Sequence, residues 1–296
     1  MTRIAILSSV MALALVTTLA TTSNLTAQGN VAEIEQVKNN LYVITGGGGN
    51  TGALVTGDGV VIVDTKNPGW ADAILEKIRT VTDHPVTMII NTHTHGDHVG
   101  SNIDFARPVE VIAHTNTKTN MEGMDAFQSE NGRQYLPSRT YDERLTLLDG
   151  ANQIDLYHFG AGHTSGDSIV VFPALGVAHT GDLFAWKGVP YIDVDNGGSG
   201  VQYPKTLLAA ADGIPGVETV IPGHSPVMTW ADFREFGEFN RDFLVAVQRG
   251  RAEGKTAAEA AASLDLPARY ANYNMSRGTL TSAEDNATKI YAELDQ

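Results

Sequence analysis

A histidine-rich segment follows an apolar run that has the pattern of a buried strand. Three histidines and an aspartate fall within six positions of it: His93, His95, Asp97 and His98. Residues two apart in an extended backbone point the same way, so His93 and His95 can present two imidazoles to one ion. Gly96 then lets the chain turn and aim Asp97 and His98 at a second point nearby. Imidazole and carboxylate groups bind zinc and similar divalent metals, so this segment predicts a metal site rather than a polar surface loop.

Three later segments each place one potential ligand in a glycine-flanked turn next to a predicted strand. The ligands are His163, Asp182 and His224. A lone histidine or aspartate in a turn is more often structural than a ligand, so none of the three predicts a site by itself. Together with the first segment, they complete the donors that two tetrahedral or five-coordinate ions require. The sequence has no cysteine, so histidine and carboxylate side chains must supply every ligand.

The elements that must position these turns alternate along the chain. Strands are expected at residues 34–37, 41–44, 53–56, 60–64, 86–90, 109–113, 145–148, 154–159, 168–172, 176–180 and 217–221. Helices are expected from Trp70 to Ile78, near Ser101, at residues 115–123 and 203–211, and through the last quarter of the chain. The apolar patterns and turn residues behind these assignments favour an α/β fold in which sheets pack face to face with helices outside them.

The composition is that of a globular protein with a strongly acidic balance. Of 296 residues, 34 are acidic and 20 are basic, which gives a formal net charge of −14, and 42% are hydrophobic. A nucleic-acid partner is not expected, because lysine and arginine hold the phosphate backbone and the sequence contains no run of them. We expect the partner to be a small-molecule substrate, and the sequence leaves the oligomeric state open.

The first 27 residues have the features of a secretory signal peptide. Arg3 provides a positive charge, residues 4–20 are apolar or small, and Leu25-Thr26-Ala27 resembles a cleavage site. A membrane anchor is the alternative, but the segment is short and rich in threonine and serine. We therefore expect export to the periplasm, removal of residues 1–27, and no membrane association after cleavage. A single domain with a helical C-terminal part is expected over residues 28–296.

The ligand candidates and their order resemble the metallo-β-lactamase superfamily over nearly all of residues 28–296. The shared pattern is His93-x-His95-x-Asp97-His98, His163, Asp182 and His224. The resemblance implies an α/β fold of four layers, an αββα sandwich, with a dinuclear metal site on one edge. It implies that one ion is held by His93, His95 and His163, that the other is held by Asp97, His98 and His224, and that Asp182 bridges the two. The expected cofactor is two Zn²⁺ per chain, with other divalent metals as alternatives.

Such a site would act by hydrolysis. A metal-bound hydroxide would attack a carbonyl carbon while one ion polarises the carbonyl oxygen. Asp97 would be the catalytic residue that orients this nucleophile or relays its proton. A serine nucleophile is not expected, because the sequence contains neither a Gly-x-Ser-x-Gly nor a Ser-x-x-Lys motif.

The leading expectation for the activity is opening of a β-lactam ring, within a broader class of cyclic amides and esters, and with it a role in antibiotic resistance. Asp182 departs from this pattern: the resemblance implies a cysteine or serine there in β-lactamase branches, and an aspartate in lactonases and glyoxalase-like thioesterases. A lactonase or thioesterase is therefore the first alternative. A non-catalytic accessory protein of an exported redox system is the second.

Several other polar residues are not expected to be ligands. The segment 47–52 fits Gly-x-Gly-x-x-Gly, but a strand is expected after it where a dinucleotide site needs a helix. Asp193 and Asp195 are expected in a solvated loop. Structural roles are expected for His84, His114, His158 and His179, with His114 as the first exception to consider. Candidates for contact with a substrate carboxylate are Lys187, Tyr191 and the segment 196–200.

Overall fold

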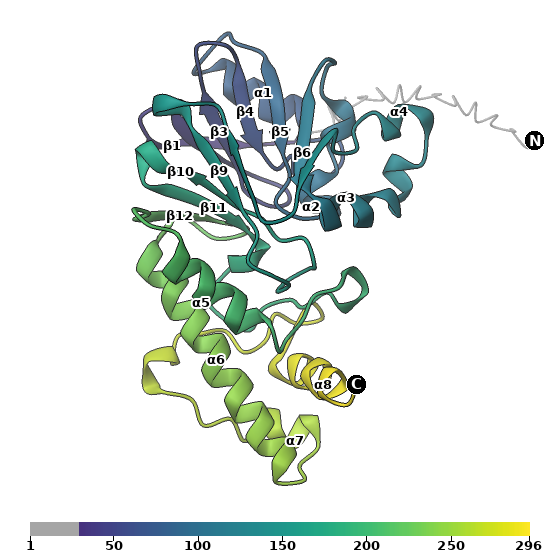
Figure 1. The fold of residues 1–296 in the computed structure, drawn as a ribbon, viewed down its shortest axis with the longest axis vertical. Helices are drawn as coiled ribbons and strands as arrows, with labels where there is room; N and C mark the ends of the chain where they lie inside the picture. Colours follow the sequence, from purple (N-terminus) through teal and green to yellow (C-terminus); the bar gives the residue numbers. More distant parts are fainter. Residues whose placement is uncertain (1–29) are drawn as a thin grey trace, which may run out of the picture.

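The fold is that of a computed structural model, in which residues 30–296 are described. The expected signal peptide, residues 1–27, lies outside the described residues. Within residues 30–296, no helix combines the length and the apolar character needed to cross a bilayer. Two β-sheets occupy the upper part of the view in Figure 1, and long helices form its lower part.

The first sheet has seven strands that follow one another in chain order. They are β1 (Glu33–Lys38), β2 (Leu41–Thr45), β3 (Thr51–Val55), β4 (Val60–Val63), β5 (Val86–Ile90), β6 (Glu110–His114) and β7 (Arg139–Tyr141). Neighbours from β1 to β4 are antiparallel, whereas those from β4 to β7 are parallel. The α-helices along this stretch are α1 (Ala71–Arg79), α2 (Gly96–Val99), α3 (Thr115–Glu122) and α4 (Glu130–Arg133). The parallel strands end at a common edge, so the segments that follow them emerge side by side.

The second sheet has six strands in the order β13-β12-β11-β10-β9-β8. They are β8 (Arg144–Leu147), β9 (Ile154–Tyr157), β10 (Ile169–Phe172), β11 (Val177–Gly181), β12 (Thr219–Pro222) and β13 (Met228–Thr229). Only β11 and β12 are parallel neighbours within this sheet, and α5 (Tyr203–Gly213) lies in the crossover between them. A parallel pair again brings two strand ends to one edge, here those that precede Asp182 and His224.

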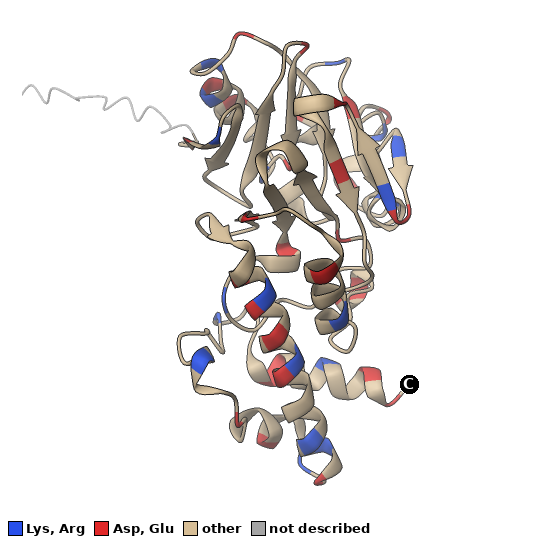
Figure 2. Cartoon of the chain, turned by 60° about the vertical axis from the view of Figure 1, so that its left-hand side comes forward, with Lys and Arg blue, Asp and Glu red and all other residues tan. Residues whose placement is uncertain are grey.

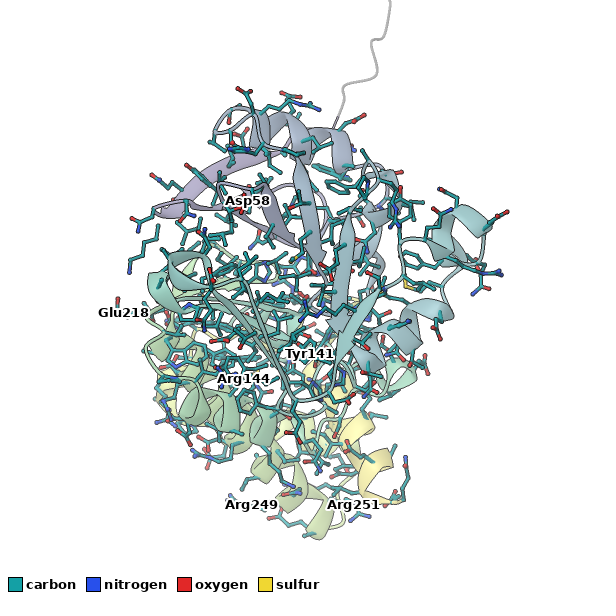
Figure 3. All side chains as sticks on the ribbon, turned by 45° about the horizontal axis from the view of Figure 1, so that its top comes forward. Asp58, Tyr141, Arg144, Glu218, Arg249 and Arg251 are labelled. Carbon is teal, nitrogen blue, oxygen red and sulfur yellow. The ribbon has the colours of Figure 1, made fainter. Side chains whose placement is uncertain are left out.

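Three helices form the C-terminal part: α6 (Trp230–Ala252), α7 (Ala257–Ala262) and α8 (Ala283–Leu294). The long helix α6 begins with a capping box between Thr229 and Asp232, which satisfies amide groups at its first turn. Arg249 and Arg251 lie in its last turn, where positive charge favours the helix dipole. Figure 3 places these two arginines at the end of the molecule opposite Asp58.

Three buried apolar clusters fill the spaces between four layers. The first packs α1 against the first sheet and includes Ile74. The second lies between the sheets and contains Ile90 from the first and Ile221 from the second. The third packs α5 and α6 against the second sheet through Leu207 and Phe236. This arrangement confirms the expected α/β fold and its αββα layers (Figure 1).

The structure differs from the expected elements in several places. Strands β7 and β13 were not expected, and both are short edge strands that pair with one neighbour each. The helix expected near Ser101 is two short turns, α2 and a 3₁₀ turn at Asn102–Asp104. Asp64 lies just beyond β4 instead of inside it, with a left-handed backbone.

Charged side chains are interspersed along the lower helices, where Lys and Arg alternate with Asp and Glu (Figure 2). Some form ion pairs, such as Arg234 with Asp212 at 2.8 Å and Lys289 with Asp285 at 2.8 Å. Exposed pairs of this kind contribute little to the free energy of unfolding. The buried clusters are therefore the main source of stability.

Replacement of Phe239 by alanine should test this conclusion on α6. The Phe239 side chain is completely buried, and its ring centroid lies 4.5 Å from that of Tyr273. We expect Phe239→Ala to lower the free energy of unfolding by roughly 3–5 kcal/mol, measured by urea denaturation. Val245 lies on the same helix and is 49% exposed, so Val245→Ala should change it by less than about 0.5 kcal/mol. Equal losses in the two variants would contradict the burial argument.

Candidate metal centre

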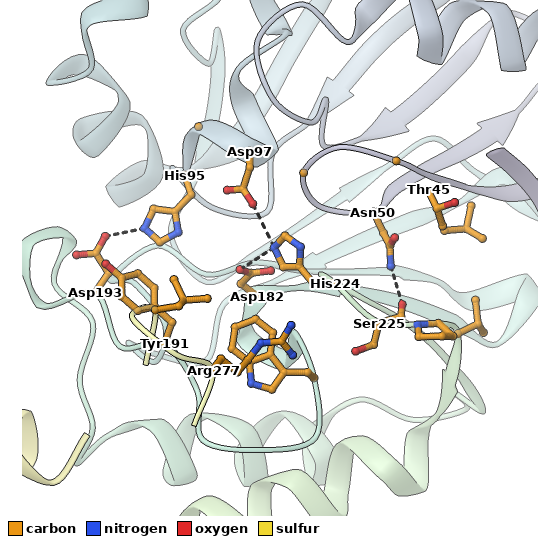
Figure 4. Close-up of a pocket in the computed structure, with 18 of the residues that line it drawn as sticks. Thr45, Asn50, His95, Asp97, Asp182, Tyr191, Asp193, His224, Ser225 and Arg277 are labelled. Atoms are coloured by element: carbon orange, nitrogen blue, oxygen red, sulfur yellow. Dashed lines mark hydrogen bonds and ion pairs between the residues drawn. The ribbon is translucent and has the colours of Figure 1, made fainter. Parts of the chain in front are cut away.

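The expected ligands come together at one edge of the sandwich. Strand β5 leads into the segment 93–98, β11 leads into Asp182, and β12 leads into His224. His163 lies in the connection between β9 and β10. Figure 4 shows Asp97, Asp182 and His224 facing the same cavity. Both sheets therefore contribute to the site.

One group of potential metal ligands comprises His93, His95, His163 and Asp182, with one atom of each within 4.8 Å of the others. His95 Nδ1 lies 2.9 Å from His163 Nε2, and Asp182 Oδ2 lies 3.8 Å from the same nitrogen. His93 Nε2 is buried and has no hydrogen-bond partner among the described residues. A buried polar nitrogen without a partner is energetically costly, so the donor set of this group fits a metal ion.

A second group comprises Asp97, His98 and His224. His224 Nε2 lies 3.2 Å from Asp97 Oδ2 and 3.3 Å from His98 Nε2. Asp182 borders this group as well, with Oδ1 at 3.2 Å from His98 Nε2 and Oδ2 at 3.3 Å from His224 Nε2. The Asp182 carboxylate thus lies close to histidines of both groups. This is the position required of a ligand that would bridge two ions.

Hydrogen bonds on their other ring nitrogens fix the orientation of the ligand histidines. His98 Nδ1 donates to Asp64 Oδ2 at 2.7 Å, and His95 Nε2 donates to Asp193 Oδ2 at 2.6 Å. His163 Nδ1 donates to a backbone carbonyl oxygen at 2.7 Å. Partners of this kind set the tautomer and ring orientation of a metal ligand and increase its basicity.

The expectation that Asp193 lies in a solvated loop is wrong. Its side chain is buried and accepts hydrogen bonds from His95 and from Asn196 Nδ2, the latter at 2.7 Å. Asp195, two residues along the same turn, is exposed as expected. Since 98 positions separate Asp193 from His95 in the sequence, only the fold shows that the two residues meet.

Burial and neighbouring charges lower the pKa of two ligand histidines and raise the pKa of two others. Burial lowers the pKa of His93 well below its ordinary value and lowers the pKa of His163 to about 4. Burial acts in the same direction on His98 and His224, but nearby carboxylates, with Asp182 foremost, outweigh it. The pKa of His98 is therefore well above its ordinary value, and that of His224 rises to about 9. In the metal-free protein at neutral pH, the first two rings are neutral and the last two are charged.

Two charged residues directly after β4 also belong to the site, although neither was among the expected site residues. Asp64 and Lys66 are completely buried, and both have a φ of 64°, which non-glycine residues rarely adopt. Asp64 accepts hydrogen bonds from the Thr92 amide at 2.8 Å and from His98. Lys66 Nζ donates to the Gly49 carbonyl at 2.6 Å, and burial lowers its pKa to about 8. The signal in the sequence is the presence of two charged residues, Asp64 and Lys66, within three positions of the end of the apolar run Val60–Val63.

The glycine-rich loop before β3 forms one wall of the site. The Gly49 amide donates to the Asp97 carbonyl at 2.9 Å, and the Asn50 side-chain amide donates to the carbonyls of Pro222, the last residue of β12, and Ser225, both at 2.8 Å. Any side chain at position 49 would overlap the His98 ring, so this close approach requires glycine. Strand β3 follows the loop, which confirms the expectation that no helix does.

A cavity of about 940 Å³ opens over the two ligand groups. Of the expected substrate contacts, Tyr191 lines it, but Lys187 and the segment 196–200 do not. The Lys187 ammonium instead lies 2.6 Å from Asp232 and 3.5 Å from Glu235. The four histidines expected to be structural belong to none of the metal-ligand groups found in residues 30–296.

Removal of the Asp193 carboxylate should weaken metal binding. We expect Asp193→Ala to lower the affinity for Zn²⁺ about 10- to 100-fold, because His95 loses the partner that fixes its ring. Competition with a chromogenic chelator measures this affinity. The matched control is Asp195→Ala, which removes an exposed carboxylate from the same turn and should leave the affinity unchanged. Similar losses in both variants would indicate a general charge effect instead.

Zinc binding to the metal-free protein should release protons, since His98 and His224 carry protons at neutral pH and must lose them to become ligands. The number released per chain should fall by about one as the pH rises through about 9, where His224 loses its proton in the metal-free protein. Calorimetric titration in buffers of different ionisation enthalpy measures this number. A release that stays constant across this range would contradict the raised pKa of His224.

Comparison with known proteins agrees with this geometry. Residues 44–245 match the family described as the metallo-beta-lactamase superfamily. The chain is 29% identical over 156 residues to the metallo-beta-lactamase type 2 of Elizabethkingia meningoseptica, an alignment that covers 48% of this chain and 57% of the relative. It is 34% identical over 144 residues to the 2,4-dinitroanisole O-demethylase subunit alpha of Nocardioides sp. (strain JS1661), covering 47% of this chain and 42% of the relative. The chain thus spans about half the length of these curated relatives.

The fold also has solved counterparts. The stereoselective inverting sec-alkylsulfatase Pisa1 from Pseudomonas sp. superimposes with a TM-score of 0.74 at 14% identity, over 88% of this chain and 50% of that one. An identity this low supports the fold and carries nothing about the substrate. The family match covers more than half of the chain and includes every expected ligand. This chain therefore belongs to the metallo-beta-lactamase superfamily.

Proposed function

We propose that this chain is a metal-dependent hydrolase that uses two Zn²⁺ and opens cyclic amides or esters, with the β-lactam ring as the leading substrate. The observation that carries the proposal is the Asp182 carboxylate, which lies within 3.8 Å of histidines from both ligand groups. The similarity to a relative named as a metallo-beta-lactamase supports the choice of leading substrate.

The residues present fit two ions. One set would comprise His93, His95 and His163, the other would comprise Asp97, His98 and His224, and Asp182 would serve both. When bound there, a pair of divalent ions lowers the pKa of water and polarises a carbonyl group. The cavity of about 940 Å³ is within the range of small-molecule sites.

Asp97 is the chain's best candidate to move a proton. Burial raises the pKa of its carboxyl, but the hydrogen bond from His224 and the charge of His98 outweigh this and bring the pKa below its ordinary value. The group is therefore ionised at neutral pH, and about a third of its side chain is open to the cavity. An ionised carboxylate at this position can orient an attacking water and accept the proton that the water loses.

A lactonase or thioesterase is the second candidate, and the residue type of Asp182 favours it over a typical β-lactamase. A non-catalytic accessory protein is a weaker candidate, since both ligand groups are complete in the structure. We further propose export to the periplasm on the basis of residues 1–27. There the enzyme would meet antibiotics, and resistance would follow from β-lactam turnover.

A substrate panel should decide among these activities. We expect the purified protein with zinc to hydrolyse a chromogenic cephalosporin and a penicillin with a kcat/KM of about 10⁴ M⁻¹s⁻¹ or more, and to lose this activity with a chelator. The other members of the panel are an acyl-homoserine lactone, a thioester and 2,4-dinitroanisole. Far higher turnover of one of these would replace the β-lactam as the substrate, and no turnover of any would favour the accessory protein.

Variants of the ligand groups test the site separately. Asp97→Asn should lower kcat about 10²- to 10⁴-fold, because the amide cannot accept the proton. His95→Ala should lower kcat together with the zinc content of the protein. The control is His84→Ala, which changes an exposed histidine outside the ligand groups and should have no effect. Unchanged hydrolysis in Asp97→Asn would remove Asp97 from the mechanism.

A further inference from the structure

One side of the cavity carries an arginine that no part of the proposed chemistry uses. Among the residues that line the cavity, Arg277 is the only lysine or arginine, whereas four carboxylates line it: Glu35, Asp97, Asp182 and Asp193. The arginines that form ion pairs in residues 30–296 are Arg144, Arg234, Arg241, Arg251 and Arg269. Arg277 is exposed and has no such partner, so its guanidinium can accept an anion from solution.

Trp186 holds this guanidinium close to the metal ligands. The guanidinium carbon of Arg277 lies 4.1 Å from the centre of the Trp186 ring, and the Trp186 ring lies 6.2 Å from that of His224. Trp186 is 5% exposed, and its Nε1 donates to the Val189 carbonyl at 3.0 Å. A guanidinium stacked on an indole keeps its N–H groups directed outward in its own plane. Figure 4 shows Arg277 on the side of His224 that is opposite Asp97.

Backbone contacts fix the loop that carries Arg277. The Arg277 amide donates to the Thr281 carbonyl at 2.8 Å, and Ser276 pairs with Ser282 across the base of the loop. Asn274 pairs with Gly188, which lies two residues after Trp186. The arginine is therefore placed over the indole before any ligand arrives, which reduces the entropy lost on binding.

Arg277 lies in a part of the chain that the family match does not include. The family match ends at residue 245, so the loop 274–282 belongs to the part of the chain that lies beyond it. The sequence-based candidate, Lys187, cannot take the same role, because its ammonium is paired with Asp232 and Glu235. Lys66 is also close to the ligand groups but does not line the cavity, so among the described residues the cation on the cavity wall comes from the C-terminal part.

We propose that Arg277 and Trp186 form a subsite for a carboxylate that the substrate carries at the end away from the bond to be cleaved. The proposal rests on the hydrolase function proposed above and narrows its substrates to anionic amides or esters. The planar fork of an arginine binds both oxygens of a carboxylate. Arg277 is the one lysine or arginine in a lining that also holds four carboxylates, so it dictates which end of such a substrate points away from the metal ligands.

Substrate pairs that differ only in this charge test the proposal in the zinc-loaded full chain. The pairs are a cephalosporin with its methyl ester, and mono-4-nitrophenyl glutarate with its methyl ester. We expect Arg277→Gln to raise KM for each free acid about 10- to 100-fold while kcat and the kinetics of the methyl esters change less than about twofold. Arg277→Lys should restore part of the affinity, since it keeps the charge without the fork.

Arg269→Gln is the matched control, because Arg269 also stacks on an aromatic ring, that of Tyr270, but does not line the cavity. Equal losses for acids and methyl esters in Arg277→Gln would overturn the proposal and assign the stack a structural role. No loss for either would also overturn it. If the wild type hydrolyses neither pair, the proposed function fails, and calorimetric binding of glutarate still decides on the subsite: weaker binding in Arg277→Gln supports it, and equal binding overturns it.

Discussion

The spacing between the two sheets controls the metal centre, because each ligand group needs donors from both of them. The first sheet brings in the segment 93–98, and the second brings in His163, Asp182 and His224. Between the sheets lies an apolar cluster whose members, such as Ile90, are completely buried. Close-packed interiors transmit small changes of volume. The packing of side chains that never contact a substrate therefore sets the distances on which metal binding depends.

The protonation states in the site follow from the burial of histidines and carboxylates together at one edge of the two sheets. Histidines and carboxylates lie within hydrogen-bonding distance of one another, so protons on His98 and His224 balance the charge of Asp97 and Asp182 in the metal-free protein. Asp64, which accepts a hydrogen bond from His98, also accepts one from the backbone of Thr92, so the chain satisfies this carboxylate. Two of the buried polar atoms left without a hydrogen-bond partner among the described residues, His93 Nε2 and Asp182 Oδ1, belong to the ligand groups, where a cation would satisfy them.

The sequence predicts those parts of the fold and site that are encoded locally. The bounds of Val86–Ile90 can be predicted because four of its five residues are apolar and the polar, histidine-rich segment begins directly after it. Strands β7 and β13 have three and two residues, too few to show a pattern, and they form only when a neighbour offers its edge. The ligands fall in short motifs, whereas the contact of Asp193 with His95, or of Arg277 with Trp186, joins distant segments that no local pattern relates.

The glycine-rich loop before β3 is held in place by hydrogen bonds within the protein. The hydrogen bond from Lys66 to Gly49 joins two connections of the first sheet, and those from Asn50 to Pro222 and Ser225 join this loop to the second sheet. All of them join groups of the protein, so the fold itself shapes this wall. A metal ion would therefore enter a site of which the fold has already shaped one wall, and exchange of that ion would leave the wall in place.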